Sequence, residues 1–374
     1  MSFIPPESDP AYQALYIHIP FCARRCNYCD FTTEAVRIDD SRIDTYLDAM
    51  LVELAAAKSR DLLGAIKTVY IGGGTPSFLG DQRLGKLVEA ITEQIDGIRE
   101  FTVEANPDSF TQQMARLLAG LGVNRLSIGI QSFDNHELTA LGRLHDSKQA
   151  ELALDAACQV FENVSVDIMC GIPLQTAATF QASLQQAVAS GINHVSVYPL
   201  SLEAGTALAE AVAAGRLTVA TDDEQARLLN QAASYLEAEG FIHYEIASYA
   251  RPGFNSQHNS AYWTARPYLG LGRGAVGMSQ QQSVRYRFDD QGILEQLDLR
   301  QQAAEDLMLG LRLLSGVPDG VVAHTQALLP TANDCLAELE GLGLIEHREG
   351  HFRLTKRGWL LGNQVFLRIW GLAE

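Results

Sequence analysis

Between residues 15 and 198, short apolar runs rich in β-branched residues alternate with longer amphipathic segments, and this alternation limits the possible folds more than any other feature. The expected strands cover residues 15–19, 67–71, 100–104, 125–130, 164–168 and 194–198. The expected helices between them cover residues 41–59, 82–94, 111–121, 148–161 and 180–190. Strands that alternate with helices form βαβ units around a parallel sheet. The sequence therefore predicts an α/β fold.

Three cysteines follow the first expected strand with the spacing Cys-x3-Cys-x2-Cys. Cys22, Cys26 and Cys29 lie so close in sequence that their thiolates can reach three corners of one iron–sulfur cubane. A 4Fe–4S cluster has four irons, so one iron would be left open to bind and reduce a small molecule. A zinc site would need a fourth ligand, usually from a second cysteine pair that this sequence lacks. A disulfide framework is not typical of a long chain with scattered cysteines.

The residues around these cysteines resemble those of the radical S-adenosylmethionine (SAM) enzymes. Tyr-Ile-His-Ile-Pro-Phe precedes Cys22, Asp-Phe follows Cys29, and Gly-Gly-Gly-Thr-Pro-Ser occupies residues 72–77. More narrowly, the chain is similar to the branch that holds oxygen-independent coproporphyrinogen III oxidase and the HemW heme chaperones. The resemblance implies a partial (β/α)6 TIM-like barrel. It also implies that SAM chelates the open iron and is cleaved reductively to a 5′-deoxyadenosyl radical.

The resemblance also implies a set of residues that hold the cofactor. In barrels of this kind, functional groups lie in loops after the carboxyl ends of strands. Glycines after the second strand would let the backbone approach the methionyl amino group, a carboxylate can bind ribose hydroxyls, and an arginine can hold the methionyl carboxylate. Singly, each residue could equally serve a turn, a strand-end hydrogen bond or core packing. The implied set consists of Tyr16, Phe31, Gly73, Gly74, Thr75, Glu104, Gln131, Arg143 and Asp167.

A second motif points to heme. His258, Asn259, Tyr262 and Trp263 form the pattern His-Asn-x-x-Tyr-Trp, which resembles a HemW motif linked to heme binding. A histidine can be an axial ligand of heme iron, and aromatic rings can pack on the macrocycle. The alternative is a surface or capping histidine beside a pair of core aromatics. Because residues 249–285 show no clear periodicity, we expect the motif in a structured loop region.

Phe31 distinguishes the two activities of this branch. The oxidases typically carry a fourth cysteine two residues after the third, and here that position is Phe31, as in the HemW proteins. The first strand also begins early, without the N-terminal extension expected of the oxidase. Arg273 and Val276 depart from the pattern, since relatives commonly carry a cysteine or other small residue and a histidine there. The chain therefore lacks one histidine that could bind heme.

These patterns predict a heme chaperone that binds heme and passes it to an apo heme-protein acceptor, such as a respiratory protein. It would carry a 4Fe–4S cluster and an exchangeable SAM. The alternative is an oxygen-independent coproporphyrinogen III oxidase, which would abstract hydrogen from a propionate side chain and release CO₂. A different radical reaction that uses a second SAM, such as methyl transfer, is a third possibility.

The charge balance excludes some partners. The chain has 45 acidic and 28 basic residues, a formal net charge of −17. Without a basic surplus, nucleic-acid binding is not expected. Strong electrostatic binding to anionic membranes is not expected either, although peripheral membrane contact stays open. No signal peptide and no apolar run long enough for a transmembrane segment is recognisable, so a cytoplasmic protein is expected.

The sequence divides into four expected segments. These are an N-terminal tail (1–14), the barrel (15–248), a connecting region with the His-Asn-x-x-Tyr-Trp motif (249–297) and a C-terminal domain (298–374). Late in the barrel we expect a helix over residues 221–240 and an extra strand over residues 242–246. The C-terminal helices followed by a small hairpin resemble a winged-helix domain of the type found in the oxidase and HemW branch.

Overall fold

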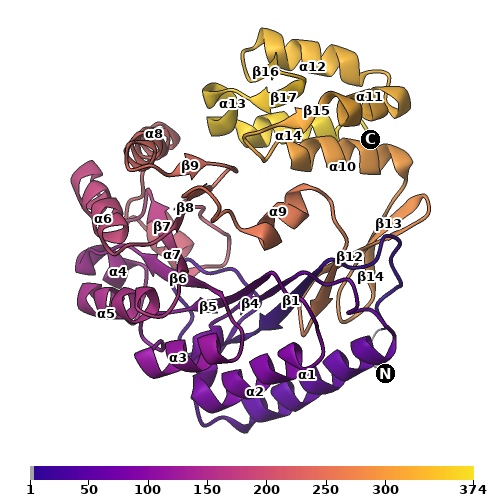
Figure 1. Ribbon diagram of the computed structural model, residues 1–374. Coiled ribbons are helices and arrows are strands. Elements are labelled where there is room, and N and C mark those ends of the chain that lie inside the picture. Colours follow the sequence, from indigo (N-terminus) through magenta and orange to yellow (C-terminus); the bar gives the residue numbers. More distant parts are fainter. Residues whose placement is uncertain (1–3) are drawn as a thin grey trace.

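The computed structural model describes residues 4–374, and six parallel strands form the centre of its largest sheet (Figure 1). These strands are β1 (Ala14–Ile19), β4 (Thr68–Gly73), β5 (Glu100–Ala105), β6 (Arg125–Gln131), β7 (Asn163–Cys170) and β8 (His194–Pro199). They are paired in chain order, each parallel to the next. β1 and β8 are not neighbours, so the barrel is open. The predicted α/β fold with a parallel sheet is confirmed.

Helices cover the convex face of this sheet, as Figure 1 shows. They are α1 (Ser41–Ser59), α2 (Gly80–Thr92), α3 (Gln112–Gly120), α5 (Ser147–Cys158), α6 (Ala177–Ala189) and α8 (Asp222–Ala238). In α2, residues Leu84, Leu87, Val88 and Ile91 recur at helical spacing and are all buried. β6 is buried at every position because a strand covered on both faces has no solvent side.

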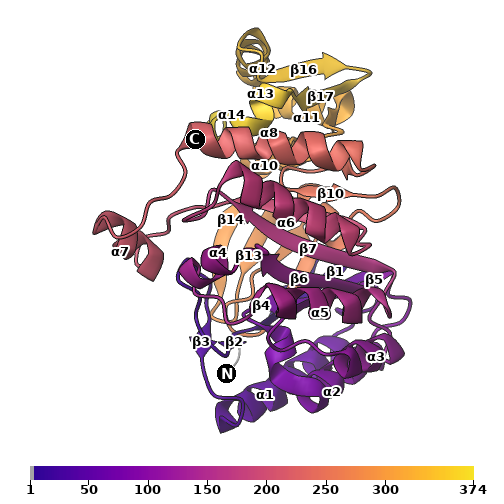
Figure 2. The same cartoon turned by 90° about the vertical axis from the view of Figure 1, so that its left-hand side faces the viewer.

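Shorter elements lie in the loops at the carboxyl ends of the strands. They are β2 (Phe21–Cys22), β3 (Glu34–Ala35), the 3-10 helix η1 (Pro76–Leu79), α4 (Asn135–Ala140) and α7 (Ala207–Ala213). Figure 2 shows α7 projecting sideways from the body. Leu208 of α7 is nevertheless buried, in a small apolar cluster with Leu141 and Met169. This cluster therefore ties α7 to the loop after β6 and to the end of β7.

The sheet is extended at both edges, which corrects the expected loop region over residues 249–285. β9 (Ile242–His243) and β10 (Ser248–Ala250) follow β8, while β11 (Tyr268–Leu271), β12 (Gly277–Gln281), β13 (Val284–Phe288) and β14 (Ile293–Leu297) extend the sheet beyond β1. The extra strand expected over residues 242–246 is only two residues long. Strands of four or five residues are too short for a recognisable period. Pairing defines them instead, because β11 pairs with β1, and β12, β13 and β14 each pair with the strand before.

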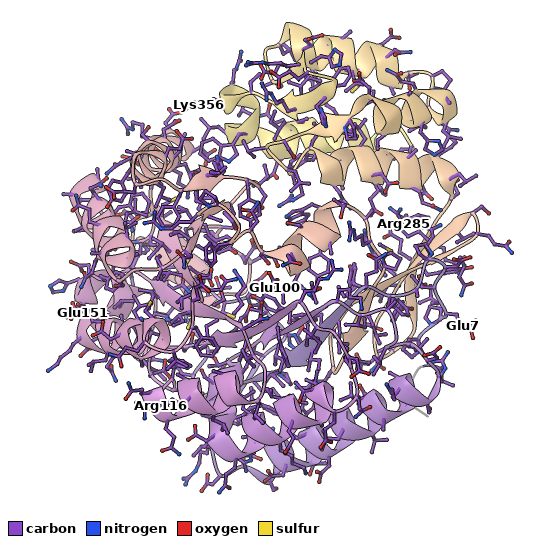
Figure 3. All side chains as sticks on the ribbon, viewed as in Figure 1. Glu7, Glu100, Arg116, Glu151, Arg285 and Lys356 are labelled. Atoms are coloured by element: carbon purple, nitrogen blue, oxygen red, sulfur yellow. The ribbon has the colours of Figure 1, made fainter. Side chains whose placement is uncertain are left out.

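Helix α9 (Gln257–Trp263) carries the His-Asn-x-x-Tyr-Trp motif and lies on the concave side of the sheet, below the C-terminal domain (Figure 1). Its first turn is held by Glu100 at the start of β5, which Figure 3 labels near the centre of the molecule. The Glu100 carboxylate accepts hydrogen bonds from the backbone N–H groups of Gln257 (2.8 Å) and His258 (2.9 Å). A carboxylate at a helix N-terminus satisfies donors that have no partner inside the helix.

The C-terminal domain has the expected helices followed by a hairpin, and two further helices come after the hairpin. Its helices are α10 (Leu299–Gly310), α11 (Asp319–Leu328), α12 (Ala332–Gly341), α13 (Lys356–Leu360) and α14 (Gly362–Trp370), and its strands are β15 (Val317–Pro318), β16 (Ile345–Arg348) and β17 (His351–Leu354). The three strands pair antiparallel in the order β15-β17-β16. A separate apolar core that includes Leu307, Leu336 and Ile369 holds this domain together.

The N-terminal tail runs along the extended edge of the sheet. Asp9 donates a backbone hydrogen bond to Gln280 of β12 (2.7 Å), and Gln280 donates one to the Ser8 hydroxyl (3.0 Å). Residues 1–3 of the expected tail lie outside the described residues. Within residues 4–374, no helix is long and apolar enough to cross a bilayer.

Candidate cofactor site and the adjoining cavity

A cavity of about 320 Å³ opens at the carboxyl ends of the parallel strands. The three cysteines and eight of the nine residues expected to hold SAM line it, although they come from the carboxyl-terminal parts of five different strands or from the loops that follow them. These residues are Cys22, Cys26, Cys29, Phe31, Gly73, Gly74, Thr75, Glu104, Gln131, Arg143 and Asp167. Parallel strands bring their carboxyl ends to one edge, so residues distant in sequence converge there. Tyr16 is the exception, since it does not line this cavity.

The cysteine loop is held by its neighbours on both sides. Asn27 donates a backbone hydrogen bond to the Leu141 carbonyl (2.9 Å), and its own carbonyl accepts one from Leu208 of α7 (2.8 Å). Thr75 donates to the sulfur of Cys22 (3.4 Å), and Arg143 donates to the sulfur of Cys26 (3.6 Å). Hydrogen bonds to ligand sulfurs are one of the means by which proteins set the potential of an iron–sulfur cluster.

The donor set fits a cubane cluster better than a single metal ion. Within residues 4–374, no three Cys, His, Asp or Glu side chains converge closely enough to ligate one ion. This arrangement does not suit a zinc site, in which all ligands meet at one point. In a cubane each thiolate binds a different iron, so the sulfurs surround the cluster rather than converge. Burial raises the pKa of Cys22 to about 11, and a bound cluster would have to displace that proton.

Two carboxyl groups lie in the same cavity and act as hydrogen-bond acceptors. Glu104 accepts from the Tyr70 hydroxyl (2.6 Å) and from the backbone N–H of Gly73 (3.1 Å). Burial raises the pKa of Glu104 to about 7 and that of Asp167 to about 6. Acceptor oxygens of this kind suit the hydroxyl and amino donors of a nucleoside.

Two residues that line this cavity have a left-handed backbone conformation. Gln131 has a left-handed φ of +70°, next to a break in the β6–β7 register after Gly129. Such a bulge turns the side chain out of the strand pattern and toward the cavity. Gly73 also has a positive φ, of +109°, and an added Cβ would lie 2.4 Å from the His18 ring. The close approach that Gly73 permits is therefore to His18, and not only to a ligand as the sequence suggested.

A second and larger cavity, of about 650 Å³, adjoins the first, and Asp30 and Phe31 line both. It lies between β1, α9, the strands β11–β13 and helix α10 of the C-terminal domain. Five aromatic residues line it, namely Tyr16, Phe31, Tyr262, Trp263 and Tyr268. Phe31 is 63% exposed, so it is not a core residue, and its ring stands at the boundary of the two cavities.

Sequence reasoning missed several residues of this second cavity. Tyr268, Met278 and Arg287 lie on the neighbouring strands β11, β12 and β13. Met278 is directly opposite Tyr268 in the β11–β12 pair and directly opposite Arg287 in the β12–β13 pair. Residues directly opposite each other point to the same face of a sheet. No motif marks these positions, and only the strand register brings them together.

The structure places His258 in the core and not in the expected loop. It is fully buried in α9, not exposed in a loop, and it lines neither cavity. One ring nitrogen hydrogen-bonds the Thr68 hydroxyl (3.0 Å) and the other the Tyr262 hydroxyl (2.8 Å). Asn259 is partly buried and also lies outside both cavities, whereas Tyr262 and Trp263 line the second. Both nitrogens of His258 are hydrogen-bonded in this structure, so the expected ligand role stays a prediction that this arrangement does not support.

Comparison with known proteins agrees with this arrangement. Residues 16–187 match the Radical SAM superfamily, and residues 297–361 match the HemN C-terminal domain. The heme chaperone HemW of Bacillus subtilis (strain 168) is 34% identical over 95% of this chain and 98% of its own length. The chain belongs to the HemW family of radical SAM proteins. The resemblance inferred from the sequence motifs is thereby confirmed.

Other relatives of this HemW-family chain support the same assignment. The heme chaperone HemW of Synechocystis sp. (strain ATCC 27184 / PCC 6803 / Kazusa) is 35% identical over 86% of this chain and 81% of its own. The coproporphyrinogen III oxidase HemN of Escherichia coli has a TM-score of 0.79 and is 20% identical, covering 96% of this chain and 90% of its own. At that identity the likeness shows a shared fold. The radical SAM family implies a 4Fe–4S cluster and SAM, and the first cavity fits both.

Acid is expected to weaken folding through buried histidines, of which His145 near the site is the clearest. Burial lowers its pKa to about 3, whereas an unfolded histidine titrates near 6.5. The unfolded chain therefore binds the extra proton, and the stability that neutral His145 contributes is lost as the pH falls below 6.5. Between pH 6.5 and 5 the loss should be about 1.5 kcal/mol. Urea unfolding of the wild type and of His145→Gln should show it as a smaller pH dependence in the variant.

The control for this experiment is His136→Gln, at an exposed position of α4. This variant should keep the wild-type pH dependence of unfolding. Equal pH dependence in the wild type and His145→Gln would contradict the explanation from burial.

Proposed function

We propose that this protein is a heme chaperone that binds heme in the second cavity and passes it to an apo heme-protein acceptor. The observation that carries the proposal is the aromatic cavity of about 650 Å³ beside the cysteine site. Ligand sites of this size, mostly apolar with a few polar groups, suit an organic cofactor. The flat faces of Tyr262, Tyr268 and Trp263 are suited to pack on a tetrapyrrole. Relatives named heme chaperones add independent support.

Among the side chains that line this cavity, Met278 is the best candidate for binding heme iron. A thioether is a known axial ligand type, and Met278 lines the cavity from a buried position on β12. His18 is already engaged, because Nε2 donates to the Thr32 carbonyl (3.0 Å) and Nδ1 accepts from the Tyr16 hydroxyl (2.9 Å). Burial raises the pKa of Tyr268, which disfavours the phenolate that would bind iron.

The first cavity would hold the cluster and SAM beside the heme. Cys22, Cys26 and Cys29 would ligate the cluster, which supplies one-electron chemistry when bound. Glu104 and Arg143 would orient SAM through its hydroxyl and carboxylate groups. Because Asp30 and Phe31 line both cavities, a ligand in one can affect the shape of the other. The cluster and SAM would in this way support or regulate heme transfer.

The rival function is that of an oxygen-independent coproporphyrinogen III oxidase. Its support is the fold shared with the E. coli enzyme. Phe31 argues against it, since this exposed ring stands between the cavities at the position where the oxidases typically carry a fourth cysteine. A phenyl ring supplies no thiolate.

The two functions are separated by parallel assays on protein reconstituted anaerobically with iron and sulfide. We expect heme to bind with a shifted Soret band, and we expect no protoporphyrinogen IX from coproporphyrinogen III in the presence of SAM and a reductant. Met278→Leu keeps the side-chain volume but removes the sulfur. It should change the heme spectrum and weaken heme binding, while iron-free protoporphyrin IX binds as in the wild type.

Met114→Leu is the matched control, because Met114 is equally buried in α3 but lies outside both cavities. It should leave the heme spectrum unchanged. Multiple-turnover formation of protoporphyrinogen IX would favour the oxidase. Failure of the wild type to bind heme would overturn the chaperone proposal, and an unchanged spectrum in Met278→Leu would overturn the iron ligand alone.

A further inference from the structure

We propose that Arg287 binds a carboxylate of the tetrapyrrole in the second cavity, and so selects iron tetrapyrroles that carry free propionates. The inference rests on the proposed heme site and adds a residue that determines specificity. Within residues 4–374, Arg287 is the only arginine or lysine whose side chain lines this cavity. A guanidinium is the group best suited to bind a carboxylate, because its fork of donors matches the two oxygens.

The position of Arg287 relative to Met278 suits such a ligand. The two residues are directly opposite each other on β12 and β13, and both line the cavity. A side chain that binds iron lies under the centre of the macrocycle, whereas the propionates leave the ring at one edge. A neighbouring strand in the sheet is about 4.8 Å away, and the long arginine side chain extends the reach toward that edge. One face of the sheet thus presents an iron ligand and a carboxylate ligand side by side.

The ion pairs around Arg287 leave its guanidinium able to bind a further carboxylate. Its guanidinium contacts Glu305 of α10, and it lies 3.5 Å from the partly exposed Glu295 of β14. Glu305 has a second and fully buried partner in Arg285, at 2.6 Å, and Arg285 also contacts Asp306 at 2.8 Å. A propionate at Arg287 would therefore leave Glu305 paired, and would compete mainly with Glu295. Figure 3 labels Arg285 between the extended sheet and the C-terminal domain.

Arg287 also has donor capacity that the protein does not use. Its Nε hydrogen has no acceptor among the described residues, although the atom is buried. About 30% of the side chain is exposed, which is unlike Arg285 with 6%. An arginine that served only to pair Glu305 would need neither the exposure nor the free donor. Both features are expected of a side chain that adjusts to accept a ligand.

The test compares heme with heme dimethyl ester, which keeps the iron and the ring but lacks the carboxylate charge. Arg287→Gln should weaken heme binding by roughly tenfold or more, because a hydrogen bond to a charged group is lost. Binding of the dimethyl ester should change by less than about twofold. Arg287→Lys should recover part of the affinity for heme, since it keeps the charge but not the fork.

A second variant tests the competition directly. Glu295→Gln removes the weaker partner of Arg287 and should tighten heme binding by a few fold, again without effect on the dimethyl ester. Arg353→Gln is the control, because Arg353 has similar exposure and pairs with Glu346 at 2.6 Å, far from the cavity in the C-terminal sheet. It should bind both ligands as the wild type does.

The outcomes separate this inference from the proposed function. If the wild type binds neither heme nor its ester, the heme site itself is wrong. If the wild type binds both, but Arg287→Gln loses affinity equally for both or for neither, Arg287 has no part in carboxylate binding. Thermal unfolding would show whether Arg287→Gln is folded. If it is not, Glu295→Gln decides the question, because unchanged heme affinity in Glu295→Gln overturns the inference.

Discussion

Alanine at Cys22, Cys26 or Cys29 is expected to abolish the iron–sulfur cluster. Reconstituted wild-type protein should contain about four iron and four sulfide per chain, and each variant should lose nearly all of both. The three thiols line one cavity and the loop that carries them is fixed by Asn27 on both sides. With only two thiolates left, two irons of the cubane lack a protein ligand, and the cluster is not retained. Iron and sulfide analysis with the visible absorption spectrum measures the loss.

The other three cysteines provide the control. Cys158 ends α5, Cys170 ends β7 and Cys335 lies in α12, and none of them lines either cavity. Burial raises the pKa of Cys170 to about 12, which keeps it a neutral thiol. Alanine at each of these positions should leave iron content unchanged. A loss of iron in any one of them would contradict the assignment of the cluster to the first three.

Replacement of His258 by alanine is expected to destabilise the fold by about 3 kcal/mol, rather than to remove an iron ligand. The side chain is fully buried, and its two ring nitrogens satisfy Thr68 and Tyr262. The substitution leaves both hydroxyls without this partner and creates a cavity, and both effects lower the free energy of unfolding. Urea unfolding of the protein without cofactors measures the change.

Thr68→Val is the matched variant, because it removes the hydroxyl that His258 bonds but keeps the shape of the side chain. It should cost about 1 kcal/mol. The folded fraction of His258→Ala should still bind heme with the wild-type spectrum, since His258 lies outside the cavity. If His258→Ala is as stable as the wild type but has lost the heme spectrum, His258 is the iron ligand after all.

Much of the candidate cofactor site could be predicted from sequence, because the resemblance to radical SAM proteins implied its residues and the hydrophobic pattern placed them at or after the ends of parallel strands. The cysteine spacing, the glycine loop after β4 and the polar groups Glu104, Arg143 and Asp167 all lie where strand ends converge. Side chains at the carboxyl ends of parallel strands lie close together once the strand order is correct. The helix expected over residues 41–59 agrees with α1, because its buried residues recur at helical spacing over a long segment.

The second cavity and the role of His258 depended on the tertiary structure. Tyr268, Met278 and Arg287 come together through the register of short strands that have no recognisable period. His258 belongs to a motif that sequence associates with heme, yet its contacts with Thr68 and Tyr262 arise because Glu100 holds α9 against the sheet. The amino-acid pattern was enough to predict the six parallel strands, the cysteine motif and the family, but not the strands that extend the sheet beyond β1. Only packing between distant segments decided which side chains face a ligand and which are enclosed in the core, because burial and hydrogen bonding depend on the neighbours that the fold supplies.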